Sequence, residues 1–92
     1  MKIIRRRDKL KIYGDLLSVL NEQSKTEKTV LTQVQARINV PFDRLKNYIS
    51  DLTDLGLIED NVSFNLTEKG KQYLVEYEKI LEFMNNMGLT YQ

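Results

Sequence analysis

Basic and amide side chains are the residues of this chain most able to do chemistry, and they suit the recognition of phosphates and bases. Arginine and lysine pair with phosphate oxygens or guanine edges, and asparagine can make two hydrogen bonds to adenine. Two groups of these residues lie close together in the sequence, one at the N-terminus and one in the middle of the chain. The candidate contacts to double-stranded DNA are Arg5, Arg6, Arg7, Lys28, Arg44, Lys46, Asn47 and Ser50.

Residues that catalyse reactions or bind metals are scarce. The 92-residue chain contains no cysteine and no histidine, which excludes disulfides, thiolate or imidazole metal sites and nucleophile–histidine pairs. Its 13 carboxylates show no calcium-loop spacing and no paired spacing. We therefore expect no enzyme activity, no metal site and no cofactor.

Membrane and secretion signals are not evident in the sequence. Apolar runs stay well short of the roughly 20 residues that span a bilayer, and the charged N-terminus lacks the apolar core of a signal peptide. The length fits one small domain, a size at which proteins often gain stability by oligomerising. We expect a cytoplasmic protein that makes no membrane contact.

The net charge of +1 hides an uneven distribution. Residues 1–11 carry six basic residues and one acidic residue, a net charge of +5, whereas residues 48–60 carry four acidic residues and no basic residue. A polyanion responds to such local charge more than to the total. The basic run from Arg5 to Arg7 is either a solvated face or an arm or helix start that contacts phosphates.

The central cluster falls in a predicted helix over residues 42–55. Its apolar residues recur at steps of three and four, so they share one face and leave the basic and amide side chains on the other. Base contacts concentrate in the N-terminal half of a recognition helix. An ordinary polar face is the alternative, because any amphipathic helix has one. The predicted buried residues are Leu45, Tyr48, Ile49, Leu52 and Leu55.

Two shorter helical patterns precede this helix, over about residues 8–23 and about residues 29–38. The Asn39-Val40-Pro41 turn ends the second pattern and leads into the third helix, which gives a helix-turn-helix. Gly14 in the first helix indicates either close packing against another helix or simple tolerance. The predicted buried residues of these two helices are Leu10, Ile12, Tyr13, Leu16, Leu17, Val19, Leu20, Val30, Leu31, Val34 and Ile38.

A short β-hairpin is predicted after the third helix. Gly56 ends the helix, residues 57–58 and 64–66 form the two strands, and Asp60-Asn61 supplies the turn. Thr67 then suits the N-cap of a further helix. The hairpin contains no lysine or arginine, and phosphates would repel Asp60. It would therefore make neutral contacts or only brace the fold.

The last predicted helix begins at Thr67 and runs to about Met87, a length of roughly 30 Å. Five of its residues fall at steps of four, three, four and three, a heptad pattern that favours self-association. A helix folded back on its own domain and a helix that binds another partner are the alternatives. The predicted dimerisation residues are Tyr73, Tyr77, Ile80, Met84 and Met87.

The run YISDLTDLGLI from Tyr48 to Ile58, followed by LTEKG from Leu66 to Gly70, resembles the "YLxxLxxxGLI … LTxKG" signature of small archaeal winged-helix proteins. The chain looks most like the dimeric archaeal DNA-binding proteins called the 10a type, and its RRRDKLKIYGDLL and KTVLTQVQARINV segments resemble their first two helices. PadR-like and MarR-like regulators share the shorter GLI … LTEKG pattern. Where the 10a family more often has a serine-type cap, this chain has Pro41. The resemblance implies a winged helix and a long C-terminal helix that pairs in an antiparallel coiled coil.

The sequence thus predicts a mainly α fold with a small β-hairpin. It consists of a winged helix-turn-helix domain over residues 1–70 and a C-terminal dimerisation helix, continuous with it, over residues 67–92. The predicted function is that of a homodimeric, nucleoid-associated DNA-binding protein whose third helix enters the major groove. It would be a transcription regulator or a chromatin-type architectural protein. The alternative is a winged-helix protein-interaction or assembly module without direct DNA binding, which the acidic hairpin and the modest net charge favour.

Overall fold

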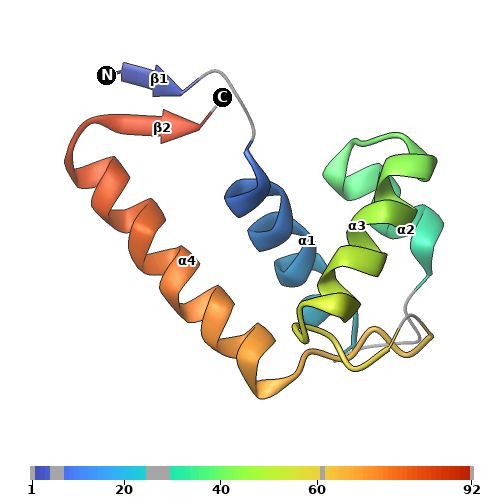
Figure 1. The fold of residues 1–92 in the computed structure, drawn as a ribbon. Helices are drawn as coiled ribbons and strands as arrows, with labels where there is room; N and C mark the ends of the chain where they lie inside the picture. The colour runs from blue at the N-terminus through green and yellow to red at the C-terminus, as the bar shows by residue number, and fades with distance from the viewer. Residues whose placement is uncertain (1, 5–7, 25–29, 61, 92) are drawn as a thin grey trace.

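The structure is a computed structural model, and it describes residues 2–4, 8–24, 30–60 and 62–91. Three helices gather on one side of the molecule, a long helix runs beside the first of them, and two short strands lie next to each other near the chain ends (Figure 1). The predicted order of helix, helix-turn-helix, short hairpin and long helix is confirmed. The elements are β1 (Lys2–Ile4), α1 (Lys9–Ser24), α2 (Leu31–Ile38), α3 (Phe42–Asp54), α4 (Glu68–Asn86) and β2 (Leu89–Tyr91).

One hydrophobic core joins α1, α2, α3 and the segment between α3 and α4. The predicted apolar faces of α1 and α3 are confirmed at most positions. Burial of a leucine, isoleucine or valine side chain stabilises a fold by about 1.5–3 kcal/mol, so these side chains fix how α3 sits on the domain. The largest fully buried side chains among the described residues are Leu16, Leu17, Leu20, Val34, Leu45, Leu52 and Ile58.

The turn between α2 and α3 has the geometry that a helix-turn-helix needs. α2 begins at Leu31 because Val30 is extended (φ −116°, ψ 120°), and the predicted burial of Val30 is wrong, since it is 44% exposed. α2 ends at Asn39, whose φ of 61° lies in the left-handed region that asparagine tolerates. Pro41 then precedes α3 with a φ of −59°, close to the value that its ring fixes.

The chain reverses direction at the end of α3. Gly56 has a φ of +76°, which confirms the predicted left-handed end of the helix. Because the reversal comes here, Leu57 and Ile58 turn back into the core, while Leu55 is left 47% exposed. The predicted burial of Leu55 is therefore wrong.

The hairpin after α3 is less regular than predicted. Its two arms share a single antiparallel bridge between Ile58 and Leu66, together with a hydrogen bond from the Glu59 N–H to the Asn65 carbonyl oxygen (2.9 Å). Phe64 has a φ of 59°, which no continuous strand adopts, although its side chain is buried. The predicted return strand is therefore reduced to a bridge, and the hairpin is a short wing.

The start of α4 is tied to the end of α3. The Thr67 hydroxyl oxygen accepts a hydrogen bond from the Gly70 N–H (3.1 Å), which confirms the predicted N-cap. The same hydroxyl donates to the Gly56 carbonyl oxygen (2.6 Å). A Cβ atom at Gly70 would overlap the Leu57 carbonyl oxygen. These contacts explain why this segment needs its two glycines and its threonine.

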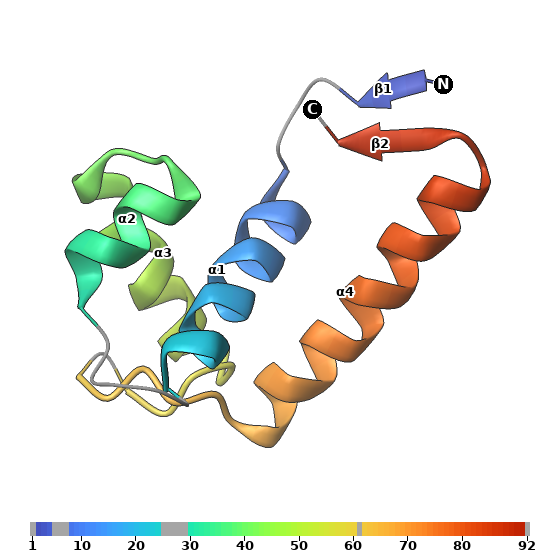
Figure 2. The same cartoon turned by 180° about the vertical axis from the view of Figure 1, so that it is seen from behind.

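α4 lies along α1, with the two helices side by side in both views (Figures 1 and 2). Gly14 of α1 faces the ring of Tyr77 of α4, so close packing is the reason for the glycine. Leu74 of α4 is buried as well. No helix within the described ranges is both long and apolar enough to cross a membrane.

The sequence did not predict the strands at the two ends of the chain. β1 and β2 pair in parallel, with Ile3 opposite Thr90, and they lie at the end of the molecule where α4 finishes (Figure 2). Residues 2–4, for which no strand pattern was evident in the sequence, form β1. The basic run Arg5 to Arg7 follows this strand and lies outside the described residues.

Candidate nucleic-acid interface

α3 turns all of its predicted contact residues toward solvent. Its buried face holds Leu45, Ile49 and Leu52 in the core. Successive residues of a helix are about 100° apart, so Asn47 and Ser50 project from the opposite face. The exposed residues on α3 that were predicted to contact DNA are Arg44, Lys46, Asn47 and Ser50.

The outward edge of α3 is the strip of its exposed face that carries Asn47 and Ser50. Two cations lie on opposite flanks of this outward edge. Arg44 shares its flank with Asp51, which contacts Tyr13, so that flank faces α1. Lys46 lies on the other flank, where its Nζ is 6.0 Å from the centroid of the Phe42 ring. The two positive charges therefore stand on either side of the amide and hydroxyl groups.

α3 itself is not a basic helix. Its two basic residues are outnumbered by three acidic ones, so the helix carries a net charge of −1. Asp43 and Asp54 share the outward edge with Asn47 and Ser50, because these four residues follow each other at steps of four and three. Most phosphate contacts in a complex with DNA would therefore require positive charge from outside α3. The helix is better suited to hydrogen bonds with base edges than to holding the backbone.

Half of the predicted DNA contacts, namely Arg5, Arg6, Arg7 and Lys28, lie outside the described residues.

A further basic residue of the helix-turn-helix is Arg37 of α2. Its guanidinium pairs with the carboxylate of Glu22 on α1 at 2.7 Å, with both side chains about half exposed. This pair braces α2 against α1 at the surface, where such a contact contributes about 1 kcal/mol or less.

Polar contacts hold α3 in place at its C-terminal half. The Tyr13 hydroxyl donates a hydrogen bond to the Asp51 carboxylate (2.8 Å), and the Tyr13 ring meets Tyr48 edge-on with centroids 6.1 Å apart. Burial of the phenol, together with the hydrogen bond and the negative charge of Asp51, raises the pKa of Tyr13 to about 12. The Lys69 ammonium donates to the Leu55 carbonyl oxygen (2.8 Å) at the end of the helix. α3 is thus fixed from α1 and from α4.

Phe42 is a surface residue of the helix-turn-helix that the sequence argument missed. It is the first residue of α3 and is 39% exposed. Side chains on a helix lean toward its N-terminus, so the Phe42 ring extends beyond the first turn, where no earlier turn covers it. The sequence did contain a signal for Phe42. Proline favours the start of a helix, and Phe42 follows Pro41 directly, so it falls at the beginning of the helix.

The wing is organised around the carboxylate of Asp60. Its Oδ1 accepts hydrogen bonds from the N–H groups of Val62 (2.8 Å) and Ser63 (2.7 Å) and from the Ser63 hydroxyl (3.1 Å). These donors hold the pKa of Asp60 below its ordinary value. The turn chemistry predicted for Asp60 is therefore confirmed, while Asn61 lies outside the described residues. Next to the turn, Val62 is 78% exposed.

The five predicted dimerisation residues do not share one exposed face. Tyr77 and Met84 are buried within the chain, and the hydroxyl of the half-buried Tyr73 donates to the Leu10 carbonyl oxygen (2.9 Å). Ile80 and Met87 are exposed. The heptad pattern thus follows the border between the side of α4 that packs on α1 and the side that faces solvent. The predicted residues are Tyr73, Tyr77, Ile80, Met84 and Met87.

A neighbouring stripe of α4 is more exposed than the predicted one. Ile80, Phe83 and Met87 follow each other at steps of three and four and are 36%, 61% and 60% exposed. The stripe continues into a mainly apolar groove of about 410 Å³ beside α1. Leu10 and Leu57 line this groove from the domain body. The sequence missed Phe83 because it lies outside the heptad positions chosen.

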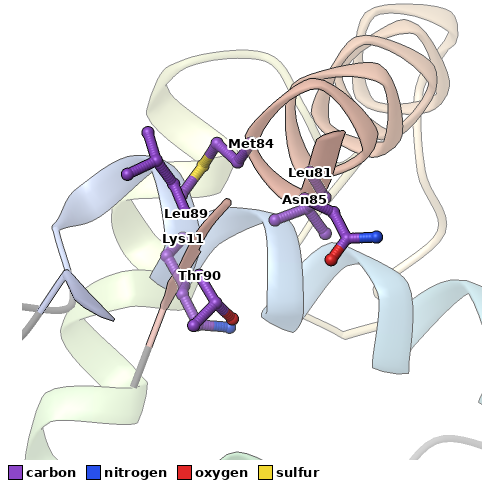
Figure 3. Close-up of a pocket in the computed structure, with 6 residues that line it drawn as sticks. All are labelled: Lys11, Leu81, Met84, Asn85, Leu89 and Thr90. Carbon is purple, nitrogen blue, oxygen red and sulfur yellow. The ribbon is translucent and has the colours of Figure 1, made fainter. Parts of the chain in front are cut away.

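A smaller cavity of about 250 Å³ lies between α1, α4 and β2 (Figure 3). The Lys11 ammonium at its wall is paired with the Asp15 carboxylate at 2.8 Å, and the Tyr77 hydroxyl donates to the same carboxylate (3.2 Å). The charge of Lys11 is therefore balanced inside the chain. The residues that line the cavity are Lys11, Leu81, Met84, Asn85, Leu89 and Thr90.

Comparison with protein families identifies the class of the chain. A family model described as winged helix-turn-helix matches residues 6–85, which is most of the sequence. The chain therefore belongs to the winged helix-turn-helix family, and the predicted fold class is confirmed. This fold is typical of DNA-binding regulators. Searches of curated proteins and of solved structures found no match.

Proposed function

We propose that this protein is a homodimeric DNA-binding protein that places α3 in the major groove, as a transcription regulator or an architectural protein of the nucleoid. The observation that carries the proposal is the outward edge of α3. It presents Asn47 and Ser50 to solvent from a helix whose opposite face is fully buried. Amide and hydroxyl groups on a rigidly held helix are suited to reading base edges.

The charge distribution divides the work of binding between two parts of the chain. α3 has a net charge of −1, whereas residues 1–11 carry a net charge of +5. We therefore assign most phosphate contacts to the N-terminal basic run from Arg5 to Arg7. Arg44 and Lys46 add contacts on the two flanks of α3, and Lys28 adds one before the helix-turn-helix. The wing, which has no basic residue in its described part, supplies at most neutral contacts.

Dimerisation through α4 is the second part of the proposal. Ile80, Phe83 and Met87 form an exposed apolar stripe beside a mainly apolar groove, and a second copy could cover both. The predicted seam thereby shifts, since Tyr77 and Met84 are buried against their own chain. The resemblance to the archaeal 10a type implies an antiparallel pairing of these helices. Two copies would also double the number of basic N-terminal segments.

A protein-interaction module that does not bind DNA is the competing function. The acidic residues of α3 and the wing favour it, because they weaken attraction to a polyanion. A partner-binding winged helix would use the same exposed edge of α3. The affinity for duplex DNA at several salt concentrations separates the two functions.

The test measures binding of a random-sequence duplex between about 50 and 300 mM salt. We expect the logarithm of the affinity to fall linearly with the logarithm of the salt concentration, by about 0.9 for each phosphate neutralised. Replacement of Arg5, Arg6 and Arg7 by alanine should reduce this slope, whereas Lys79→Ala on α4 should leave it unchanged. Absence of binding at the lowest salt would favour the interaction module.

A further inference from the structure

We propose that Phe42 contacts the 5-methyl group of a thymine and so contributes to the choice of DNA site. The inference rests on the proposed function, because it requires α3 to lie in the major groove. It starts from the exposure of Phe42. Within residues 30–54, Tyr48 is the other aromatic residue, and it packs against Tyr13 of α1.

The position of Phe42 is the first argument. It begins α3 directly after Pro41, and N-terminal residues of a recognition helix come closest to base edges. Side chains on a helix lean toward its N-terminus, which here is the open end of α3, and Phe42 is 39% exposed. An aromatic side chain left open at this point adds apolar surface where most of α3 offers polar groups.

The contact with Lys46 is the second argument. The Lys46 ammonium lies 6.0 Å from the centroid of the Phe42 ring, at the limit of a cation–π interaction. Lys46 is one turn further along the helix, so the pair joins an apolar ring to a positive charge on the same flank. In a major groove, the ring would meet base edges while the ammonium reached a backbone phosphate.

Thymine is the base that such a pair distinguishes. In the major groove it presents a methyl group beside a carbonyl acceptor, and apolar side chains contact that methyl group. Cytosine, adenine and guanine have no methyl group at this edge. An exposed phenylalanine therefore favours T·A over C·G at the base pair that it touches, without requiring a hydrogen bond.

The experiment removes one methyl group at a time from the DNA. A preferred duplex is first selected from a randomised library with the full-length protein, and each thymine in it is then replaced by deoxyuridine. We expect the affinity of the wild-type protein to fall about 3- to 10-fold when one particular thymine is replaced by deoxyuridine. A loss of this size corresponds to the free energy of transferring one methyl group out of water. Phe42→Ala should bind the thymine duplex more weakly and should lose the difference between thymine and deoxyuridine.

Leu55→Ala is the matched control, because Leu55 is an exposed apolar residue at the other end of the same helix. It should keep the response to deoxyuridine, and thermal unfolding should show that both variants remain folded. A response that persists in Phe42→Ala, or a preferred site with no responsive thymine, overturns the inference alone. A wild-type protein that binds no duplex overturns the proposed function and this inference with it.

Discussion

The aromatic ring of Tyr77 on α4 lies directly against the backbone of Gly14 on α1. A Cβ atom at residue 14 would overlap the ring atoms of Tyr77, so the two helices approach this closely only because residue 14 is glycine. The Tyr77 hydroxyl also donates to the Asp15 carboxylate (3.2 Å). This contact fixes α4 on its own domain and leaves Tyr77 only 4% exposed.

Gly14→Ala should therefore destabilise the protein, although alanine is the better helix former. The higher helix propensity favours the variant by about 1 kcal/mol, whereas forcing a methyl group into a packed contact typically costs about 1–3 kcal/mol. We expect a net loss of about 1 kcal/mol or more, measured by urea unfolding. Ser18 lies one turn after Gly14 in α1 and is exposed, so Ser18→Ala should change stability by less than about 0.5 kcal/mol. A Gly14→Ala variant that is more stable than wild type would contradict the contact.

Phe83→Glu should convert the proposed dimer to monomers without unfolding the chain. Phe83 is 61% exposed, so a glutamate there costs little in the monomer but places a charge in the proposed interface. Met84→Glu differs, since Met84 is buried in its own chain and its replacement should lower the thermal stability as well. Light scattering gives the mass and circular dichroism gives the melting temperature of each variant.

Val62→Glu provides the control for a new charge at an exposed apolar site. Val62 is 78% exposed on the wing and does not belong to the stripe of Ile80, Phe83 and Met87, so this variant should keep the mass of the proposed dimer. Wild-type protein that is monomeric at high micromolar concentration would reject the dimer altogether. An unchanged dimer in Phe83→Glu would instead place the interface elsewhere.

The stability of the fold should decrease in strong alkali because of Tyr13. Its pKa is raised from 10.0 to about 12, so the folded state holds the phenolic proton more tightly than the unfolded state. The stability from this group is complete below pH 10 and is lost as the pH rises toward 12. Tyr13→Phe cannot titrate, so its unfolding free energy should fall less than that of wild type between pH 9 and pH 11.5. Other titrating groups act in both proteins, so equal losses would show that Tyr13 does not carry the effect.

The sequence predicted the helices because their apolar periodicity is local. Leu45, Ile49 and Leu52 needed no knowledge of distant segments, and Gly56 and Thr67 mark helix ends through backbone chemistry alone. The errors occur where tertiary packing decides. Phe64 takes a left-handed conformation that its residue type does not suggest, and the wing consequently keeps one bridge.

Long-range contacts also explain what the sequence missed. β1 and β2 have three residues each and come from opposite ends of the chain, so neither has a local pattern strong enough to predict their pairing. The heptad reading of α4 assumed that the helix lay free. Once Gly14 allows α1 to approach, Tyr77 and Met84 become internal and Phe83 becomes the exposed residue. No property of α4 alone distinguishes these arrangements.

Asn47→Ala and Arg44→Ala should distinguish a regulator from an architectural protein. Asn47 projects from the outward edge of α3, opposite the buried Leu45, Ile49 and Leu52. If it reads a base, its loss should cost about 1–3 kcal/mol on a selected site and much less on random DNA. An architectural protein should instead lose a similar small factor on every duplex.

Arg44→Ala should have a different effect on DNA binding from Asn47→Ala. Arg44 lies on the flank of α3 that faces α1, whereas Asn47 lies on the outward edge. If it contacts a phosphate, Arg44→Ala should weaken binding about equally on all sequences and reduce the salt slope by about 0.9. Binding curves of both variants on the selected and the random duplex, at two salt concentrations, separate the effects. If neither variant changes binding to either duplex, α3 does not enter the groove. The exposed edge of α3 would then be available to a protein partner. Its acidic residues Asp43 and Asp54 would favour binding of a protein over binding of DNA.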